Sequence, residues 1–149
     1  MSTEILAPLP GRAMPLSEVP DPVFSAEMVG SGVAIEPLDT DEQTTVVAPI
    51  SGSIVKLHPH AAVIVSEAGV GVLLHLGIDT VGKPDLFEVK AAEGDHVNAG
   101  EPLIVFSPNA VRRLGLSAAV PVVVMDTEPG AALQPATGSV ETGAVLFSI

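Results

Sequence analysis

Three of the four histidines of the chain, His58, His60 and His75, lie in one apolar stretch, LHPHAAVIVSEAGVGVLLHL. Neutral imidazole binds zinc, for which His-x-His is a ligand-like spacing, and it is also a nucleophile towards phosphoryl groups. A single buried histidine is commonly only a hydrogen-bonded core residue. Two imidazoles in contact are different, because they cannot both be protonated without a like-charge cost. We therefore expect a functional site where the fold brings two of these rings together.

The elements that must position the rings are two apolar strands joined by a turn at residues 66–69, SEAG. If this turn closes symmetrically, His60 lies directly opposite His75, with Cβ atoms about 4.5–5.5 Å apart. A three-residue loop would shift the register by one and place Leu76 opposite His60. Small and apolar residues flank both rings, so the predicted site is a shallow apolar dish, with Asp79 returning to the face of His75.

A dry histidine pair is suited to carrying a phosphoryl group. The group on His75 would be negatively charged, His60 would donate a hydrogen bond to it, and the apolar dish would slow its hydrolysis. The chain shows no P-loop glycine motif, no lysine-based nucleotide grip and no carboxylate pair for magnesium. We therefore expect another protein, rather than ATP, to supply the phosphoryl group.

The rest of the chain predicts an all-β fold, an antiparallel sandwich or barrel. Short Val-rich runs alternate with Gly- and Pro-containing turns about every ten residues. One short helix is expected near residues 108–114, with Ser107 as N-cap, Pro108 at the first helical position and Gly115 at the end. A Val-x-x-Gly-x-x-Leu pattern occurs in two places and predicts a duplicated Gly-turned hairpin motif.

The domain organisation is predicted to be simple. Residues 1–20 contain four prolines and few large apolar side chains, which is typical of a flexible tail. Residues 21–149 are then one domain, a length sufficient for a single core.

Composition excludes several classes of function. The chain has no cysteine, so disulfides, thiolate zinc sites and thiol nucleophiles are excluded. Its net charge of −12 disfavours nucleic-acid binding. The charge either favours encounter with a basic protein or a cationic ligand, or serves only to maintain solubility. No apolar run is long enough to span a membrane, and the first residues lack a secretory signal. We therefore expect a cytoplasmic protein without direct membrane insertion.

The segment VLLHLGIDTV, residues 72–81, resembles the glucose-family IIA component of the bacterial phosphoenolpyruvate-dependent sugar phosphotransferase system. A histidine fifteen positions before His75 strengthens this resemblance. The supporting stretches are VPDPVFSAEMVGSGVAI, VVAPISGSIVKL, AAEGDHVNAGEPLIVF and TGSVETGAVLFSI. The similarity extends from about Val19 to the C-terminus.

The resemblance implies a free-standing IIA phosphocarrier. His75 would accept a phosphoryl group from the phosphohistidine of the small carrier protein HPr, and His60 would contact the phosphate. The acceptor would be a IIB domain of a sugar permease, usually through a cysteine. No cofactor and no resident metal are implied, and zinc would occur only at an interface shared with a partner. Regulation through the phosphorylation state is not assigned.

The resemblance also implies a rim that contacts the partner. Asp21 and Asp79 would meet an arginine of HPr, while Val23 and Phe24 would lie near the dish. Many relatives carry a threonine at the position of His58, so His58 either replaces that threonine at the rim or is a surface residue.

Two other functions remain open at this stage. A zinc hydrolase of a related β-barrel type would need a third ligand beside the histidines, for which Asp79 is the candidate. A lipoyl- or biotinyl-type carrier is suggested by GDHVNAG, but none of the three lysines lies in a modification context.

Overall fold

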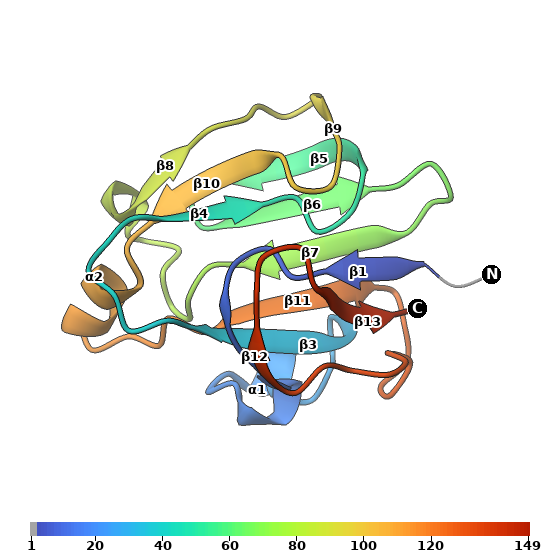
Figure 1. The fold of residues 1–149 in the computed structure, drawn as a ribbon, viewed down its shortest axis with the longest axis horizontal. Helices are drawn as coiled ribbons and strands as arrows, with labels where there is room; N and C mark the ends of the chain where they lie inside the picture. Colours follow the sequence, from blue (N-terminus) through green and yellow to red (C-terminus); the bar gives the residue numbers. More distant parts are fainter. Residues whose placement is uncertain (1–2) are drawn as a thin grey trace.

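The computed structural model describes residues 3–149 as three antiparallel β-sheets with very short helices, which confirms the all-β prediction (Figure 1). The largest sheet has eight strands in the order β12-β2-β3-β11-β7-β6-β5-β9. In chain order, these strands are β2 (Gly11–Pro15), β3 (Gly30–Pro37), β5 (Gly52–His58), β6 (Ala61–Val65), β7 (Gly71–His75), β9 (His96–Val97), β11 (Val120–Met125) and β12 (Gly138–Val140).

Two smaller sheets complete the architecture. The order of the three-stranded sheet is β4-β10-β8, and β1 pairs with β13 in the two-stranded sheet. Their bounds are β1 (Glu4–Leu6), β4 (Thr44–Val47), β8 (Phe87–Val89), β10 (Pro102–Phe106) and β13 (Val145–Ser148). The main core joins Leu74 and Val122 of the large sheet to Phe106 and Phe147 of the smaller ones, all fully buried.

A second apolar cluster covers the other face of the large sheet. There the 3-10 helix η1 (Leu16–Glu18) and the helix α1 (Pro22–Ser25) bring Leu16 and Phe24 onto the sheet residues Ala34 and Val123. In Figure 1, α1 lies below β3, on the side away from β8 and β10. Because β11 is Val-rich, it supplies side chains to both clusters, and the two-sided burial fixes the centre of the sheet.

The expectation that residues 1–20 form a flexible tail is wrong for residues 3–20, while Met1 and Ser2 lie outside the described residues. Ile5, Ala7 and Leu9 are fully buried in the main core. The prolines do not prevent this, because they occupy turns and strand ends, where a missing N–H is tolerated. Pro8, for example, lies between strands and accepts a hydrogen bond from the Val47 amide at 2.9 Å. No domain boundary therefore separates residues 3–20 from the rest.

The predicted helix is α2 (Pro108–Arg113), capped by the Ser107 hydroxyl, which accepts from the Ala110 amide at 3.4 Å. Beyond it, η2 (Pro84–Leu86) is a single 3-10 turn. Within residues 3–149, no helix has the length and apolar character needed to cross a bilayer.

The two copies of the Val-x-x-Gly-x-x-Leu pattern adopt the same local structure. Gly100 and Gly143 both adopt positive φ, at 96° and 88°, and their amides donate to Ala48 and Ala7 respectively, each at 2.9 Å. In each copy, the strand before the glycine belongs to the large sheet and the strand after it to a smaller sheet. The motif therefore turns the chain from one layer to the next, and its two strands do not pair with each other as in a hairpin.

Candidate functional site

The hairpin that carries the histidines has the shifted register of the two considered. Ala61 pairs with His75, and the Leu76 amide donates to the His60 carbonyl at 2.7 Å. The directly opposed arrangement of His60 and His75 is therefore wrong. The reason lies in the turn, where Gly69 adopts a φ of 86° and the Ser66 amide donates to the Val70 carbonyl at 3.0 Å. This closes a three-residue loop, which such a left-handed glycine favours.

The two rings nevertheless meet. His60 lies with Pro59 in the tight turn between β5 and β6, so its side chain does not follow the alternation of a strand. The ring centroids of His60 and His75 are 5.1 Å apart, with an angle of 69° between the planes. His58, at the end of β5, stacks on His60 with a centroid distance of 5.6 Å and planes 20° apart. The three imidazoles thus form a row in which His60 is central.

The tautomer of His75 follows from its backbone partner. The Nδ1 atom lies 2.6 Å from the carbonyl oxygen of Gly77. A carbonyl can only accept, so Nδ1 carries the proton and, in the neutral ring, Nε2 carries the lone pair. Nε2 is therefore the nucleophilic atom of His75.

The loop after His75 is held in place from several sides. The amides of Gly77 and Ile78 donate to the carbonyls of Ala119 and Ser117, at 3.0 and 2.9 Å. Gly77 has a φ of 78°, which side chains rarely adopt, and a Cβ there would lie 2.8 Å from Cγ2 of Thr80. Sequence reasoning did not single out Gly77 or Thr80, although HLGIDT shows a glycine two residues after the histidine, where a left-handed turn is to be expected.

Three residues of the expected rim, Asp21, Phe24 and Asp79, lie near His75. Phe24 is buried and its ring centroid lies 5.5 Å from that of His75. Asp21 caps α1, since one carboxylate oxygen accepts from the amides of Val23 and Phe24 at 2.8 and 3.2 Å. Val23, which precedes Phe24 in α1, is 41% exposed and presents an apolar side chain to solvent.

Both central histidines favour the neutral form. Burial lowers the pKa of His75, against the opposing effects of the Gly77 carbonyl and of the carboxylates of Asp21 and Asp79, all of which raise it. Burial also lowers the pKa of His60, and the neighbouring His75 and His58 lower it further. The pair is therefore predominantly neutral near pH 7, so each ring keeps one nitrogen lone pair.

The structure gives no support to a zinc hydrolase. Within residues 3–149, no three His, Cys, Asp or Glu side chains are grouped closely enough to hold a metal ion. Asp79 was the candidate third ligand, and it does not complete such a group with the histidines.

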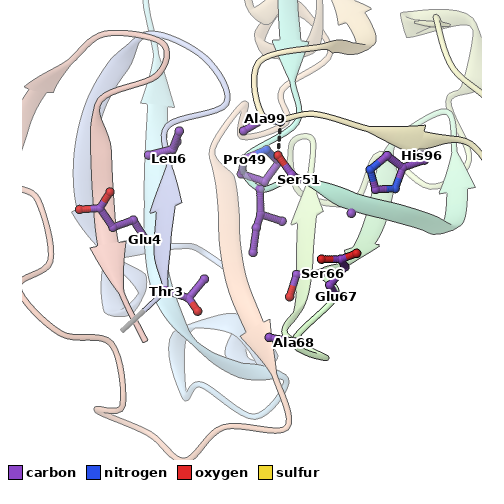
Figure 2. Close-up of a pocket in the computed structure, with 12 residues that line it drawn as sticks. Thr3, Glu4, Leu6, Pro49, Ser51, Ser66, Glu67, Ala68, His96 and Ala99 are labelled. Atoms are coloured by element: carbon purple, nitrogen blue, oxygen red, sulfur yellow. Dashed lines mark hydrogen bonds between the residues drawn. The ribbon is translucent and has the colours of Figure 1, made fainter. Parts of the chain in front are cut away.

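The fourth histidine lies elsewhere, beside an open hollow of about 540 Å³ (Figure 2). Ser66, Glu67 and Ala68 from the β6–β7 loop line this hollow together with His96, and the Ser51 hydroxyl accepts from the Ala99 amide there at 2.9 Å. This hollow is at the loop end of the hairpin, whereas His75 is at the other end of β7. His96 is therefore separate from the histidine row.

The chain is similar to known proteins over nearly its whole length. Residues 3–129 match the family described as phosphoenolpyruvate-dependent sugar phosphotransferase system, EIIA 1. The glucose-specific EIIA component of Bacillus cereus is 37% identical over 141 residues, covering 93% of this chain and 83% of that protein. The structure of glucose permease IIA from Mycoplasma capricolum has a TM-score of 0.88 at 33% identity, covering 99% of this chain and 96% of that one.

A longer relative shows the same similarity within a larger protein. The glucose-specific EIIBCA component of Corynebacterium glutamicum is 44% identical over 124 residues, which is 81% of this chain but only 18% of that protein. The part of the chain that matches the family model, residues 3–129, includes the HLGIDT loop, His60 and His75. The chain belongs to the EIIA 1 family of the phosphoenolpyruvate-dependent sugar phosphotransferase system and is a phosphocarrier component of that system.

Proposed function

We propose that His75 carries the phosphoryl group on Nε2 and that His60 stabilises it. The observation that supports this most strongly is the hydrogen bond from His75 Nδ1 to the Gly77 carbonyl, because it leaves the Nε2 lone pair available in a ring whose pKa is lowered by burial. His60 is in edge contact with this ring, and its neutral imidazole has one N–H to donate to a phosphoryl oxygen.

The phosphoryl donor in this proposal is the phosphohistidine of HPr, and the acceptor is a IIB domain of a sugar permease. In the first step, a bond forms between His75 Nε2 and phosphorus while the nitrogen–phosphorus bond of the donor breaks, and the electron pair returns to the donor ring. The Nδ1 proton stays on His75, held by Gly77. In the second step the group leaves Nε2 for the IIB nucleophile, so neither step needs a nucleotide or water.

The rim supports a partner with a cationic contact surface. Asp21 and Asp79 lie close enough to His75 to raise its pKa, and the chain as a whole has a net charge of −12. Such a field speeds the encounter with a basic face and orients it before contact. Val23 adds an exposed apolar contact next to these acids.

Relatives that are named for different sugars are similar to the chain to nearly the same degree. Corynebacterium glutamicum has relatives named glucose-specific and mannose-specific EIIBCA components, at 44% and 40% identity. Because HPr and IIB must share a compartment with the chain, the proposal also places it in the cytoplasm.

The test is phosphorylation of the purified chain by phosphoenolpyruvate, enzyme I and HPr. We expect an acid-labile adduct on the wild type and on His60→Gln, but none on His75→Gln. His96→Gln is the matched control, because that histidine lies by the separate hollow, and it should be labelled like the wild type. Labelling of His75→Gln at the wild-type level would contradict the assignment.

The role of His60 is tested in the onward step. His60→Gln should accept the phosphoryl group but transfer it slowly to a purified IIB domain, because the contact to the phosphoryl oxygens is lost. Transfer at the wild-type rate would remove His60 from the mechanism and leave the role of His75 intact.

A further inference from the structure

Thr80 is a buried polar residue of the described chain, 1% exposed, and it lies five residues after His75. Its hydroxyl donates to the Leu76 carbonyl at 2.8 Å. This bond joins the two ends of the loop formed by residues 76–80, which follows His75 in the chain. Burying a hydroxyl without a hydrogen bond costs free energy, so the bond to Leu76 compensates for the burial of the Thr80 hydroxyl.

The bond fixes one of two successive peptide planes. In the first plane, the Leu76 carbonyl accepts from Thr80 and the Gly77 amide donates to Ala119. In the second plane, the Gly77 carbonyl accepts from His75 Nδ1 and the Ile78 amide donates to Ser117. Each plane is therefore held at both ends, and the Thr80 hydroxyl is the partner of the Leu76 carbonyl that holds the first.

The methyl group of Thr80 acts on the same residue. An added Cβ on Gly77 would lie 2.8 Å from Thr80 Cγ2, so this methyl packs against the Gly77 backbone. Gly77 has a φ of 78°, a conformation in which glycine has more freedom than any other residue. Without neighbours on both sides, the Gly77 carbonyl would be free to turn away from the imidazole.

We propose that Thr80 is a positioning residue for His75. By holding the Leu76–Gly77 peptide plane, it keeps the Gly77 carbonyl on Nδ1 and so keeps the lone pair on Nε2. Its effect on the rate of phosphoryl transfer depends on the function proposed for His75, whereas its effect on the tautomer does not.

The experiment compares Thr80→Val, which removes the hydroxyl at nearly constant volume, with Thr80→Ser, which keeps it. The readouts are the ¹⁵N chemical shifts of the His75 ring nitrogens and the initial rate of phosphorylation by phospho-HPr. Thr80→Ser loses the methyl contact with Gly77 but keeps the hydroxyl, so we expect His75 to keep the Nδ1–H tautomer in it, with a rate near that of the wild type. In Thr80→Val we expect a mixture with the Nε2–H tautomer and a rate lower by about fivefold, the order of effect of one lost hydrogen bond.

The matched control is Thr127→Val. The Thr127 hydroxyl donates to the Val124 carbonyl at 2.7 Å. Thr127 lies beyond the end of β11, and Val124 pairs with Val72, near the start of β7 and away from His75. This variant should lose stability without changing the His75 shifts. Equal changes in both valine variants would show only a structural role and overturn the proposal, as would unchanged shifts in Thr80→Val.

If Thr80→Val does not fold, Thr80→Ala is compared with Thr80→Ser, because both lack the methyl group and only the serine keeps the hydroxyl. A mixed tautomer in Thr80→Ala alone supports the proposal, and equal shifts in the two variants overturn it. If the wild type is not phosphorylated on His75, the proposed function fails, and the ¹⁵N shifts still decide whether Thr80 sets the tautomer.

Discussion

At the scale of single residues, the site depends on two imidazoles that stay neutral for different reasons. His75 is half-buried and is surrounded by groups that favour its charged form, yet burial outweighs them and lowers its pKa. The pKa of His60 is lowered by burial and by the charges that its two neighbours, His75 and His58, would acquire on protonation. The consequence is a pair of rings that keep their lone pairs at pH values where an ordinary histidine is partly protonated.

We predict that phosphoryl acceptance stays at its plateau as the pH falls through about 6.5, the ordinary value for histidine, and declines only below it. NMR titration should give pKa values under this value for both His60 and His75. His58→Gln should raise the pKa of His60, because a like charge is removed, but leave the pKa of His75 in place. A fall in the His60 pKa in this variant would contradict the stacking geometry.

The same shifts make stability depend on pH. Because both pKa values are lower in the folded state, the unfolded chain binds more protons once the pH falls below about 6.5, and the folded state loses stability from there down to the folded pKa values. Above that window the histidines contribute no slope. Urea midpoints at several pH values should show this slope in the wild type and a smaller one in His60→Gln/His75→Gln.

At the scale of elements, the four-residue helix α1 holds Phe24 against His75 although it is far too short to be stable alone. It persists because Asp21 caps its amides and because Phe24 is buried in the second cluster. Asp21 therefore has a local duty besides its negative charge, and the two can be separated by substitution.

We predict that Asp21→Ala lowers the free energy of unfolding by about 1 kcal/mol, the usual value of an N-cap, and weakens the packing of Phe24. Asp21→Asn keeps the cap and should unfold at nearly the wild-type urea concentration. Both variants should slow phosphorylation by HPr at low salt, since both lose the charge. A destabilised Asp21→Asn would show that the cap requires the charge.

The register of the β6–β7 hairpin could not be predicted from the sequence. The letters SEAG allow both a symmetric turn and a three-residue loop, and only the left-handed φ of Gly69 decides between them. The contact of His60 with His75 was expected for the wrong register and occurs because Pro59 and His60 form a turn of their own. The alternation of apolar residues in β6 and β7 was sufficient for the strands, but it carries no information on turn side chains.

At the scale of the whole molecule, the N-terminal residues belong to the core rather than to a tail. β1 pairs with β13, so the two ends of the chain close one sheet. Composition could not show this, because four prolines and scattered apolar residues are also typical of unfolded segments. What distinguishes the N-terminal segment is the pairing of β1 with β13 and of β2 with β12, strands that lie more than a hundred residues further along the chain.

We predict that Leu9→Ala lowers the free energy of unfolding by about 3 kcal/mol, the cost of a cavity in a close-packed core. Leu38→Ala is the matched control, because Leu38 is 53% exposed and should change stability by less than about 0.5 kcal/mol. Urea denaturation measures both. Equal and small changes in the free energy of unfolding of the two variants would contradict the assignment of residues 3–20 to the core.

The pairing of the two ends also determines how the molecule can be attached to something else. Thr3 and Ile149 exchange two backbone hydrogen bonds, at 3.0 and 2.9 Å, and both lie with Gly71 around one open hollow at the start of β7. In Figure 1 the start of β1 and the end of β13 lie on the same side of the molecule, opposite α2. A tether fixed at either end would therefore be attached near Gly71, at the opposite end of β7 from His75, and a short linker between the ends would permit circular permutants with an unaltered histidine row.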